Sequence, residues 1–297
     1  MQVQSPPARR ARALKVTHAN HYQYDQPITR SSHRVHLRPI HDRWQTVRSH
    51  RLEVSPNVEL REFEDVFGNW TSQFEVNGPY SRLSIVAESV VELCEFDPFG
   101  FAKGPLRPVF PVHWMPWELK MLTPYLAPVE LPETQLGEIH DFAMGFVTRN
   151  RHDLLEALFD MNLTLFRDFK FVPRSTSMET TPFDVLTTKQ GVCQDFANLM
   201  ICMARMLNIP ARYVCGYLFT GNTGAGRAGP DASHAWVQLY VPHEGWKDFD
   251  PTNGILPASD HVRVAVGRHY RDTAPTAGTL FSSAAERLTV SVEVAPL

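Results

Sequence analysis

Cys193 is the residue of this 297-residue chain whose surroundings best suit a nucleophile. It follows Gly191 in the stretch TTKQGVCQDFANLMICMARML, and a residue without Cβ lets the chain turn sharply and approach a substrate closely. Apolar residues recur after it at helical spacing: Phe196, Met200, Met203 and Leu207. This spacing predicts a helix that begins at Cys193 and buries one face. The unpaired N–H groups and the positive dipole end of a first helical turn favour a thiolate over a thiol.

A thiol nucleophile needs a base to accept its proton and a third group to orient that base. His234 opens an expected strand that runs to Val241, on the face opposite the most apolar side. Asp250 ends the next expected strand, which starts at Trp246. In an antiparallel hairpin the start of the first strand lies beside the end of the second. We therefore expect His234 to lie next to Asp250.

Other residues could fill the same roles. Asp248 shares the strand face of Asp250 and is its main rival, whereas Asp231 lies on a glycine-rich loop that would hold an imidazole poorly. That loop, Gly221 to Pro230, is a candidate lid over bound substrate. The backbone N–H of Cys193 is the expected oxyanion donor, with Gln190 as a weak second candidate.

The remaining cysteines fit a packing role. Cys202 lies nine positions after Cys193, about half a helical revolution away, so the two thiols cannot share one helix face. We expect Cys202 and Cys215 to be core residues. With Cys94 there are four cysteines and no CxxC, which favours free thiols in a reducing compartment over disulfides or a zinc knuckle. The expected location is cytoplasmic, because the N-terminal arginines precede no apolar stretch.

The elements around these residues divide the chain into three parts. Residues 13–95 alternate with a period of two, as in Arg82 to Leu93, and predict an N-terminal antiparallel β domain in the form of a sandwich. A hairpin turn is expected at Phe67 to Asn69. Residues 96–132 hold eight prolines among aromatic side chains, which predicts an ordered connector without a regular helix.

Residues 133–297 predict an α+β domain, with helices first and an antiparallel sheet after them. Helical periodicity marks two segments before the Cys193 helix, Leu136 to Phe146 and Leu154 to Phe166. Strands are expected at Ala211 to Phe219, in the hairpin described above, and at Leu288 to Val294, which we assign to the same sheet.

Composition excludes several partners. A net charge of −3 gives no sign of nucleic-acid or membrane binding. The N-terminal histidines lack ligand spacing and are read as solvated or edge-strand residues: His18, His21, His33, His36, His41 and His50. No acidic cluster has the spacing of a calcium loop, so we predict no metal and no cofactor.

Four separated blocks carry a resemblance: PFDVLTTKQGVCQDFANL, IPARYVCGYL, DASHAWVQLYVPHEGWKDFDPTNG and DHVRVAVGRHY. Together they resemble the bacterial transglutaminase-like family, whose core has a papain-like fold, and the preceding region ending in ESVVEL is similar to its N-terminal β domain. The resemblance implies that Cys193 is the nucleophile, His234 the general base and acid, and Asp250 the residue that orients the imidazole. The family often has His in place of Asn198 and Asp in place of His269, departures that bear on substrate preference.

The implied chemistry is acyl transfer from an amide of a peptide or protein through a thioester. If water resolves the thioester, the protein is a peptidase or amidase, which we favour; if an amine does so, it is a transglutaminase. The alternative from another class is a non-catalytic binding protein on the same scaffold. Retention of Cys193, His234 and Asp250 together argues against that alternative.

Overall fold

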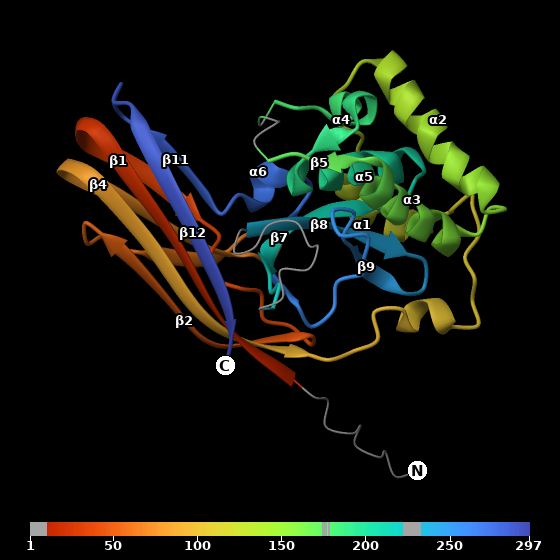
Figure 1. Cartoon of the computed structure of the whole chain (residues 1–297), viewed down its shortest axis with the longest axis horizontal. Helices are drawn as coiled ribbons and strands as arrows, with labels where there is room; N and C mark the ends of the chain where they lie inside the picture. The colour runs from red at the N-terminus through yellow and green to blue at the C-terminus, as the bar shows by residue number, and fades with distance from the viewer. Residues whose placement is uncertain (1–10, 174–176, 178, 222–232) are drawn as a thin grey trace, which may run out of the picture.

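Three layers make up the protein: a cluster of helices, a central antiparallel sheet, and a large N-terminal sheet that packs against the central one (Figure 1). A computed structural model describes residues 11–173, 177, 179–221 and 233–297. The expected α+β class, with an N-terminal β domain before a papain-like core, is confirmed. The candidate lid from Gly221 to Pro230 lies almost wholly outside the described residues, as does Asp231.

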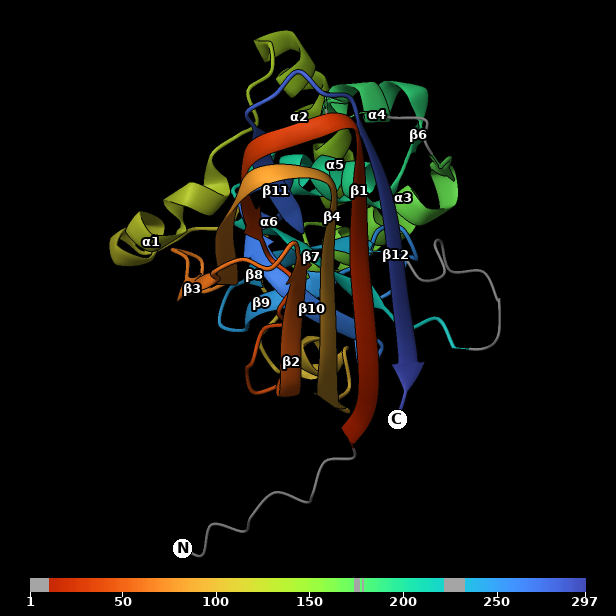
Figure 2. The same ribbon diagram turned by 90° about the vertical axis from the view of Figure 1, so that its left-hand side faces the viewer.

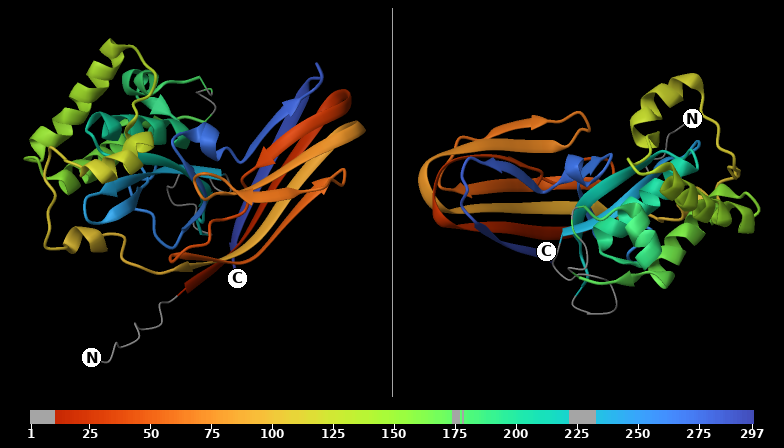
Figure 3. Two further views of the ribbon diagram at one scale, coloured as in Figure 1. Left: turned by 180° about the vertical axis from the view of Figure 1, so that it is seen from behind. Right: turned by 90° about the horizontal axis from the view of Figure 1, so that it is seen from above.

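The N-terminal sheet is built on two long antiparallel strands, β1 (Ala11–Val35) and β4 (Trp70–Cys94). β2 (Gln45–Ser55) and β3 (Arg61–Glu64) pair with successive parts of β4, and the expected turn after β3 joins it to β4. Buried and exposed residues alternate along β4, which confirms the period-two pattern. The sandwich expectation is wrong in one respect: the strands belong to a single sheet that bends over its own core, with register shifts between Gln23 and Arg30 (Figure 3).

The last strands join the N-terminal sheet, which corrects the assignment of Leu288 to Val294 to the second sheet. β11 (Thr276–Leu280) and β12 (Glu286–Pro296) pair with successive halves of β1 (Figure 2). Alternation identifies a strand and its buried face but carries no information about which neighbour supplies its hydrogen bonds. Residues 133–297 are therefore divided between both sheets.

The proline-rich segment contains a short 3₁₀ helix, η1 (Gly100–Lys103), and a regular helix, α1 (Pro116–Leu126). The expectation that it holds no regular helix is therefore wrong. Pro116 occupies the first turn, where a missing N–H leaves no bond unmade, and the Glu118 carboxylate accepts from the Met115 N–H at 3.0 Å. The segment is ordered as expected, and Phe101, Phe110 and Trp114 pack against the helical core.

The second part of the chain folds as predicted into helices followed by antiparallel strands. Its helices are α2 (Glu133–Arg149), α3 (Leu154–Asp168), α4 (Pro182–Thr188), α5 (Cys193–Met206) and α6 (Tyr270–Thr273). A small parallel pair, β5 (Lys170–Phe171) and β6 (Gln190–Gly191), precedes α5. The central sheet has the order β10-β7-β8-β9, with β7 (Ala211–Leu218), β8 (Ser233–Val241), β9 (Gly245–Phe249) and β10 (His261–Gly267).

Helix α5 is more deeply buried than its periodicity predicts. Ten of its residues are buried, including both Asp195 and Arg205, because helices, the central sheet and the connector surround it. The prediction that one face is buried is thus confirmed but incomplete. A helix enclosed on all sides is held rigidly, and so is the position of its first residue. Within the described ranges, no helix has the length and apolar character needed to cross a membrane.

The N-terminal sheet covers the face of the central sheet opposite α5. A shared apolar cluster joins them: Leu14, Val16, Val91, Leu93, Val292 and Val294 with Tyr217, Val262 and Val264. Polar side chains reinforce the contact. The Asn69 amide brackets the backbone of Val266, donating to its carbonyl at 2.8 Å and accepting its N–H at 2.7 Å, and Gln45 brackets Arg263 in the same way.

Several N-terminal histidines are buried in this part of the fold, which corrects their interpretation as solvated or edge-strand residues. His18, His33 and His36 are at most 7% exposed, and burial lowers the pKa of His18 and His33 to about 4. They hydrogen-bond to protein partners: His18 to the Tyr217 hydroxyl, for example, at 3.0 Å. A neutral imidazole can be buried with hydrogen-bond partners alone, whereas a charged one would also need a partner of opposite charge.

Asn69→Ala tests the contact between the sheets. It would leave the N–H and carbonyl of Val266 buried and unpaired, so we expect a loss of about 2–3 kcal/mol in the free energy of unfolding. Urea denaturation followed by circular dichroism measures it. Asn57→Ala, at an exposed position of the same region, is the matched control and should change stability by less than about 0.5 kcal/mol. Equal stability of the two variants would contradict a bracing role for Asn69.

Candidate active site

Cys193 is the first residue of α5, as predicted, and its side chain is half-buried. The Asp195 carboxylate caps the helix start by accepting the Val192 N–H at 2.8 Å. A Cβ added to Gly191 would lie 2.8 Å from the Cβ of Asp195, so a side chain there would displace the cap. Gly191 is thus needed for close packing against the helix start.

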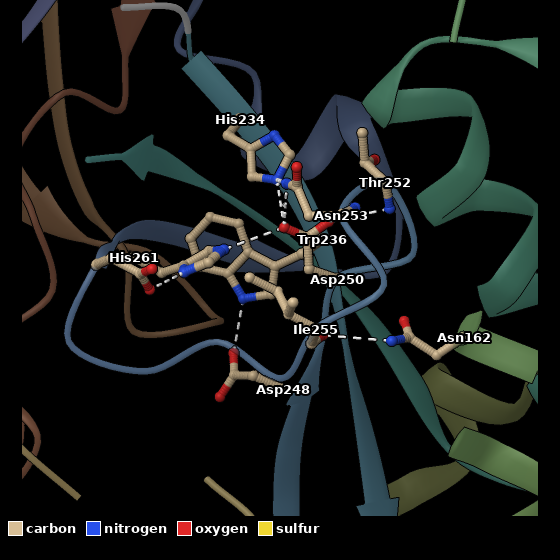
Figure 4. Close-up of polar contacts among 10 residues, drawn as sticks. Asn162, His234, Trp236, Asp248, Asp250, Thr252, Asn253, Ile255 and His261 are labelled. Carbon is tan, nitrogen blue, oxygen red and sulfur yellow. Dashed lines mark hydrogen bonds and ion pairs between the residues drawn. The ribbon is translucent and has the colours of Figure 1, made fainter. Parts of the chain in front are cut away.

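His234, the second residue of β8, points towards both other candidate residues. Its side chain hydrogen-bonds to Cys193. Its Nε2 lies 2.8 Å from Oδ2 of Asp250 (Figure 4). The β8–β9 register pairs Val237 with Phe249, and its continuation puts His234 diagonal to Asp250 on one face. The structure therefore brings together the three residues selected from the sequence.

Asp250 is completely buried at the start of a tight turn that follows β9. Its Oδ1 accepts the backbone N–H groups of Thr252 at 3.0 Å and Asn253 at 3.2 Å. The turn closes at Gly254, whose φ of 65° favours glycine and whose missing Cβ leaves room for Phe166. The backbone thus fixes one carboxylate oxygen and leaves Oδ2 for side chains.

Asp248, the rival candidate, is engaged elsewhere. Its carboxylate accepts from Trp236 Nε1 at 2.7 Å and from Gln238 Nε2 at 2.9 and 3.0 Å. These contacts hold two polar side chains of β8 on the face that the N-terminal sheet covers. Of these two aspartates, Asp250 is the one in contact with His234.

Two residues that sequence reasoning missed complete the surroundings of Asp250. Its Oδ2 also accepts from Asn253 Nδ2 at 2.7 Å and contacts His261 Nε2 at 3.1 Å (Figure 4). The other ring nitrogen of His261, Nδ1, lies 2.7 Å from Oδ1 of Asp260. The alternating run HVRVAV was a signal for strand β10. Alternation alone did not show which face His261 would lie on, because that depends on the strand with which β10 pairs.

The buried charges stabilise one another. Burial alone would raise the pKa of Asp250, but hydrogen bonds and charge interactions with His234 and His261 hold it far below its usual value. Burial alone would lower the pKa of His234, but the Asp250 carboxylate and Cys193 raise it above the usual value. The arrangement favours an ionised Asp250 and an imidazolium at His234, which suits partnership with a thiolate.

The ligand-type atoms of His234, Asp250 and His261 all lie within 4.8 Å of one another, a spacing that would also suit a metal ion. A metal needs unprotonated imidazole nitrogens. Here the two Nε2 atoms face Oδ2 directly at hydrogen-bond distance, and both imidazoles have raised pKa values. Protons account for these contacts, so we treat the group as a hydrogen-bond network.

The other cysteines on the core elements are packed as predicted. Cys202 is 0% and Cys215 6% exposed, and burial raises their pKa values to about 11 and about 12. All four cysteines are free thiols.

Comparison with known proteins gives the family. Residues 14–92 match the bacterial transglutaminase-like N-terminal region, and residues 141–251 match the transglutaminase-like superfamily. An uncharacterized protein of Mycobacterium tuberculosis is 31% identical over 298 residues, covering 95% of this chain and 92% of that protein. The chain belongs to the transglutaminase-like superfamily.

This transglutaminase-like chain is also similar to an enzyme of known activity and to a solved structure. A protein-glutamine gamma-glutamyltransferase of Pseudomonas aeruginosa is 30% identical over 122 residues, 39% of this chain and 18% of that enzyme. The crystal structure of a candidate cysteine protease from Cytophaga hutchinsonii has a TM-score of 0.77 and 23% identity, covering 97% of this chain and 91% of that one. The second likeness extends over both sheets of the transglutaminase-like fold.

Thiol accessibility gives a direct test of the site. We expect iodoacetamide at pH 6 to label Cys193 at least about tenfold faster than Cys202 or Cys215, because those two are buried and have raised pKa values. Peptide mapping by mass spectrometry measures the three rates. Comparable labelling of all three thiols in the folded protein would contradict the assignment of Cys193.

Proposed function

We propose that the protein is a cysteine-dependent enzyme that cleaves an amide bond of a peptide or protein through a thioester. The observation that carries this is the contact chain from Cys193 through His234 to Asp250. Cys193 sulfur attacks the carbonyl carbon, and His234 gives its proton to the departing amine as the C–N bond breaks. His234 then takes a proton from the second nucleophile, whose attack breaks the C–S bond and releases Cys193 as a thiolate beside the imidazolium.

Asp250 acts through His234 in this proposal. Because Nε2 of His234 faces the carboxylate, the other ring nitrogen is the one available to the thiol. Asp250 thereby fixes the ring orientation and stabilises the imidazolium that forms.

The oxyanion formed during attack needs nearby donors. The backbone N–H of Cys193 belongs to the first turn of α5, where N–H groups have no partner within the helix. It supplies one donor in our proposal. Gln190, three residues earlier and exposed, stays a candidate for the second.

Water is our favoured second nucleophile. A transferase must hold an amine beside the thioester, and a carboxylate is the natural group to do so. Asp195 is the acidic residue nearest Cys193 in sequence, but its carboxylate caps α5. The name of the Pseudomonas aeruginosa relative supports amine transfer as the alternative. A non-catalytic scaffold is less favoured because it has no need of a buried charge pair beside a thiol.

We extend the proposal to the cell compartment. Four free thiols suit a reducing environment, so the proposed location is the cytoplasm.

Asp250→Asn and Asp248→Asn separate the roles of the two aspartates. Asp250→Asn should lower kcat by about 10²–10⁴-fold, because an amide neither stabilises the imidazolium nor fixes its tautomer. Asp248→Asn, the matched control, keeps an acceptor for Trp236 and should change kcat less than about tenfold. Steady-state kinetics on a substrate found in the assay below measures both. A larger loss in Asp248→Asn, with both proteins folded, would overturn the assignment of Asp250.

The second nucleophile is tested with a peptide library containing glutamine, supplied with excess labelled primary amine. We expect cleaved peptides or deamidated glutamine without label, identified by mass spectrometry. Cys193→Ala is the control and should give no product. Dominant incorporation of the amine would establish transfer and contradict our preference for water. Absence of product together with an unreactive Cys193 would favour the binding scaffold.

A further inference from the structure

His261 contacts carboxylates with both of its ring nitrogens. Nε2 lies 3.1 Å from Oδ2 of Asp250, and Nδ1 lies 2.7 Å from Oδ1 of Asp260. An ionised carboxylate can only accept hydrogen bonds, and a neutral imidazole has a single N–H to donate. Both contacts are satisfied when His261 carries both protons and a positive charge. Its side chain is 1% exposed, so water does not screen that charge.

The charge of His261 acts on His234 through their common partner. Both imidazoles contact the same oxygen of Asp250, and their ring centroids are 5.9 Å apart. A carboxylate that also stabilises a cation at His261 holds the proton of His234 less strongly. At an effective dielectric constant of about 20, two unit charges at about this distance interact by the equivalent of about two pH units.

We propose that His261 is a positioning residue of the Cys193 site: as a buried cation between Asp250 and Asp260 it shares the Asp250 carboxylate with His234 and limits how tightly His234 keeps its proton. An acid that must protonate a departing amine works best when its proton is not held too strongly. This inference rests on the proposed function for its catalytic consequence, whereas the charge relation itself can be measured without a substrate.

The surroundings of His261 fit this account. On the side of the active site it meets Asp250 and His234, and Asp260 adjoins it in the chain. Its other side borders a cleft of about 420 Å³ between the N-terminal and central sheets, beside the Trp236 ring. The charged residues on that cleft are Arg43, Asp97, Glu244, Lys247, Asp248 and Arg263. Within the described ranges the hydrogen bonds of the His261 ring go to the two carboxylates, which raise its pKa although burial alone would lower it.

The first measurement uses the unaltered protein. Nitrogen-15 NMR of histidine-labelled protein should show both ring nitrogens of His261 protonated at pH 7–8, with the signals assigned by their loss from His261→Gln. An unprotonated ring nitrogen at His261 in that range would overturn the proposal.

The second measurement follows His234 in His261→Gln, which keeps an N–H donor but removes the charge. The midpoint of the His234 titration should rise by about one to two pH units, and the high-pH limb of kcat/KM should move upward with it. His50→Gln, which removes a half-buried histidine of the N-terminal sheet, is the matched control and should move neither. An unchanged or lowered midpoint in folded His261→Gln would mean that His261 only supports the structure. If no substrate is turned over but the midpoint rises, the proposed function fails and the charge relation stands.

Discussion

The Asp250 carboxylate is the group on which the architecture of the site depends. It is fully buried, and such a charge costs several kcal/mol unless donors surround it. Five donors do so: the backbone N–H groups of Thr252 and Asn253, and the side chains of Asn253, His234 and His261. These donors lie on three segments: strand β8, the turn that follows β9, and strand β10. The carboxylate is therefore satisfied only when all three segments are in their correct positions. Removing it would leave buried partners uncompensated, at a cost of about 3–5 kcal/mol.

The N-terminal sheet has a structural role that follows from this requirement. β10 and β8 carry His261, Trp236 and His234, and their outer faces pack against the N-terminal sheet. The side chains of Asn69 and Gln45 each form two hydrogen bonds to the backbone of β10, at Val266 and Arg263 respectively. The return of the chain through β11 and β12 then ties the end of the molecule to β1. The N-terminal sheet thus holds β10 in place behind the network.

Local patterns in the sequence predicted the reactive side of the site well. The turn before α5 and the hairpin of β8 and β9 are short-range features, so Cys193, His234 and Asp250 could be selected together. Long-range pairing was beyond the same reasoning: β12 alternates like any strand, and only the open edge of β1 decides where it pairs. His261 was missed for the same reason, because its contact with Asp250 depends on where β10 lies in the central sheet, which local patterns do not reveal. The α1 helix was missed because the prolines of the segment were weighed by number, whereas Pro116 lies in the first turn of the helix, where proline is tolerated.

Burial of both faces of the central sheet explains why its polar side chains form separate networks. On β8, His234, Trp236 and Gln238 share the face turned from α5, and each is at most 5% exposed. Water cannot satisfy them, so each needs a protein partner. Asp248 serves Trp236 and Gln238, whereas Asp250, one step beyond β9, serves His234 at the end of the strand where Cys193 also lies. Two aspartates of like chemistry thus differ in role because one pairs with the strand interior and the other with the imidazole beside the thiol.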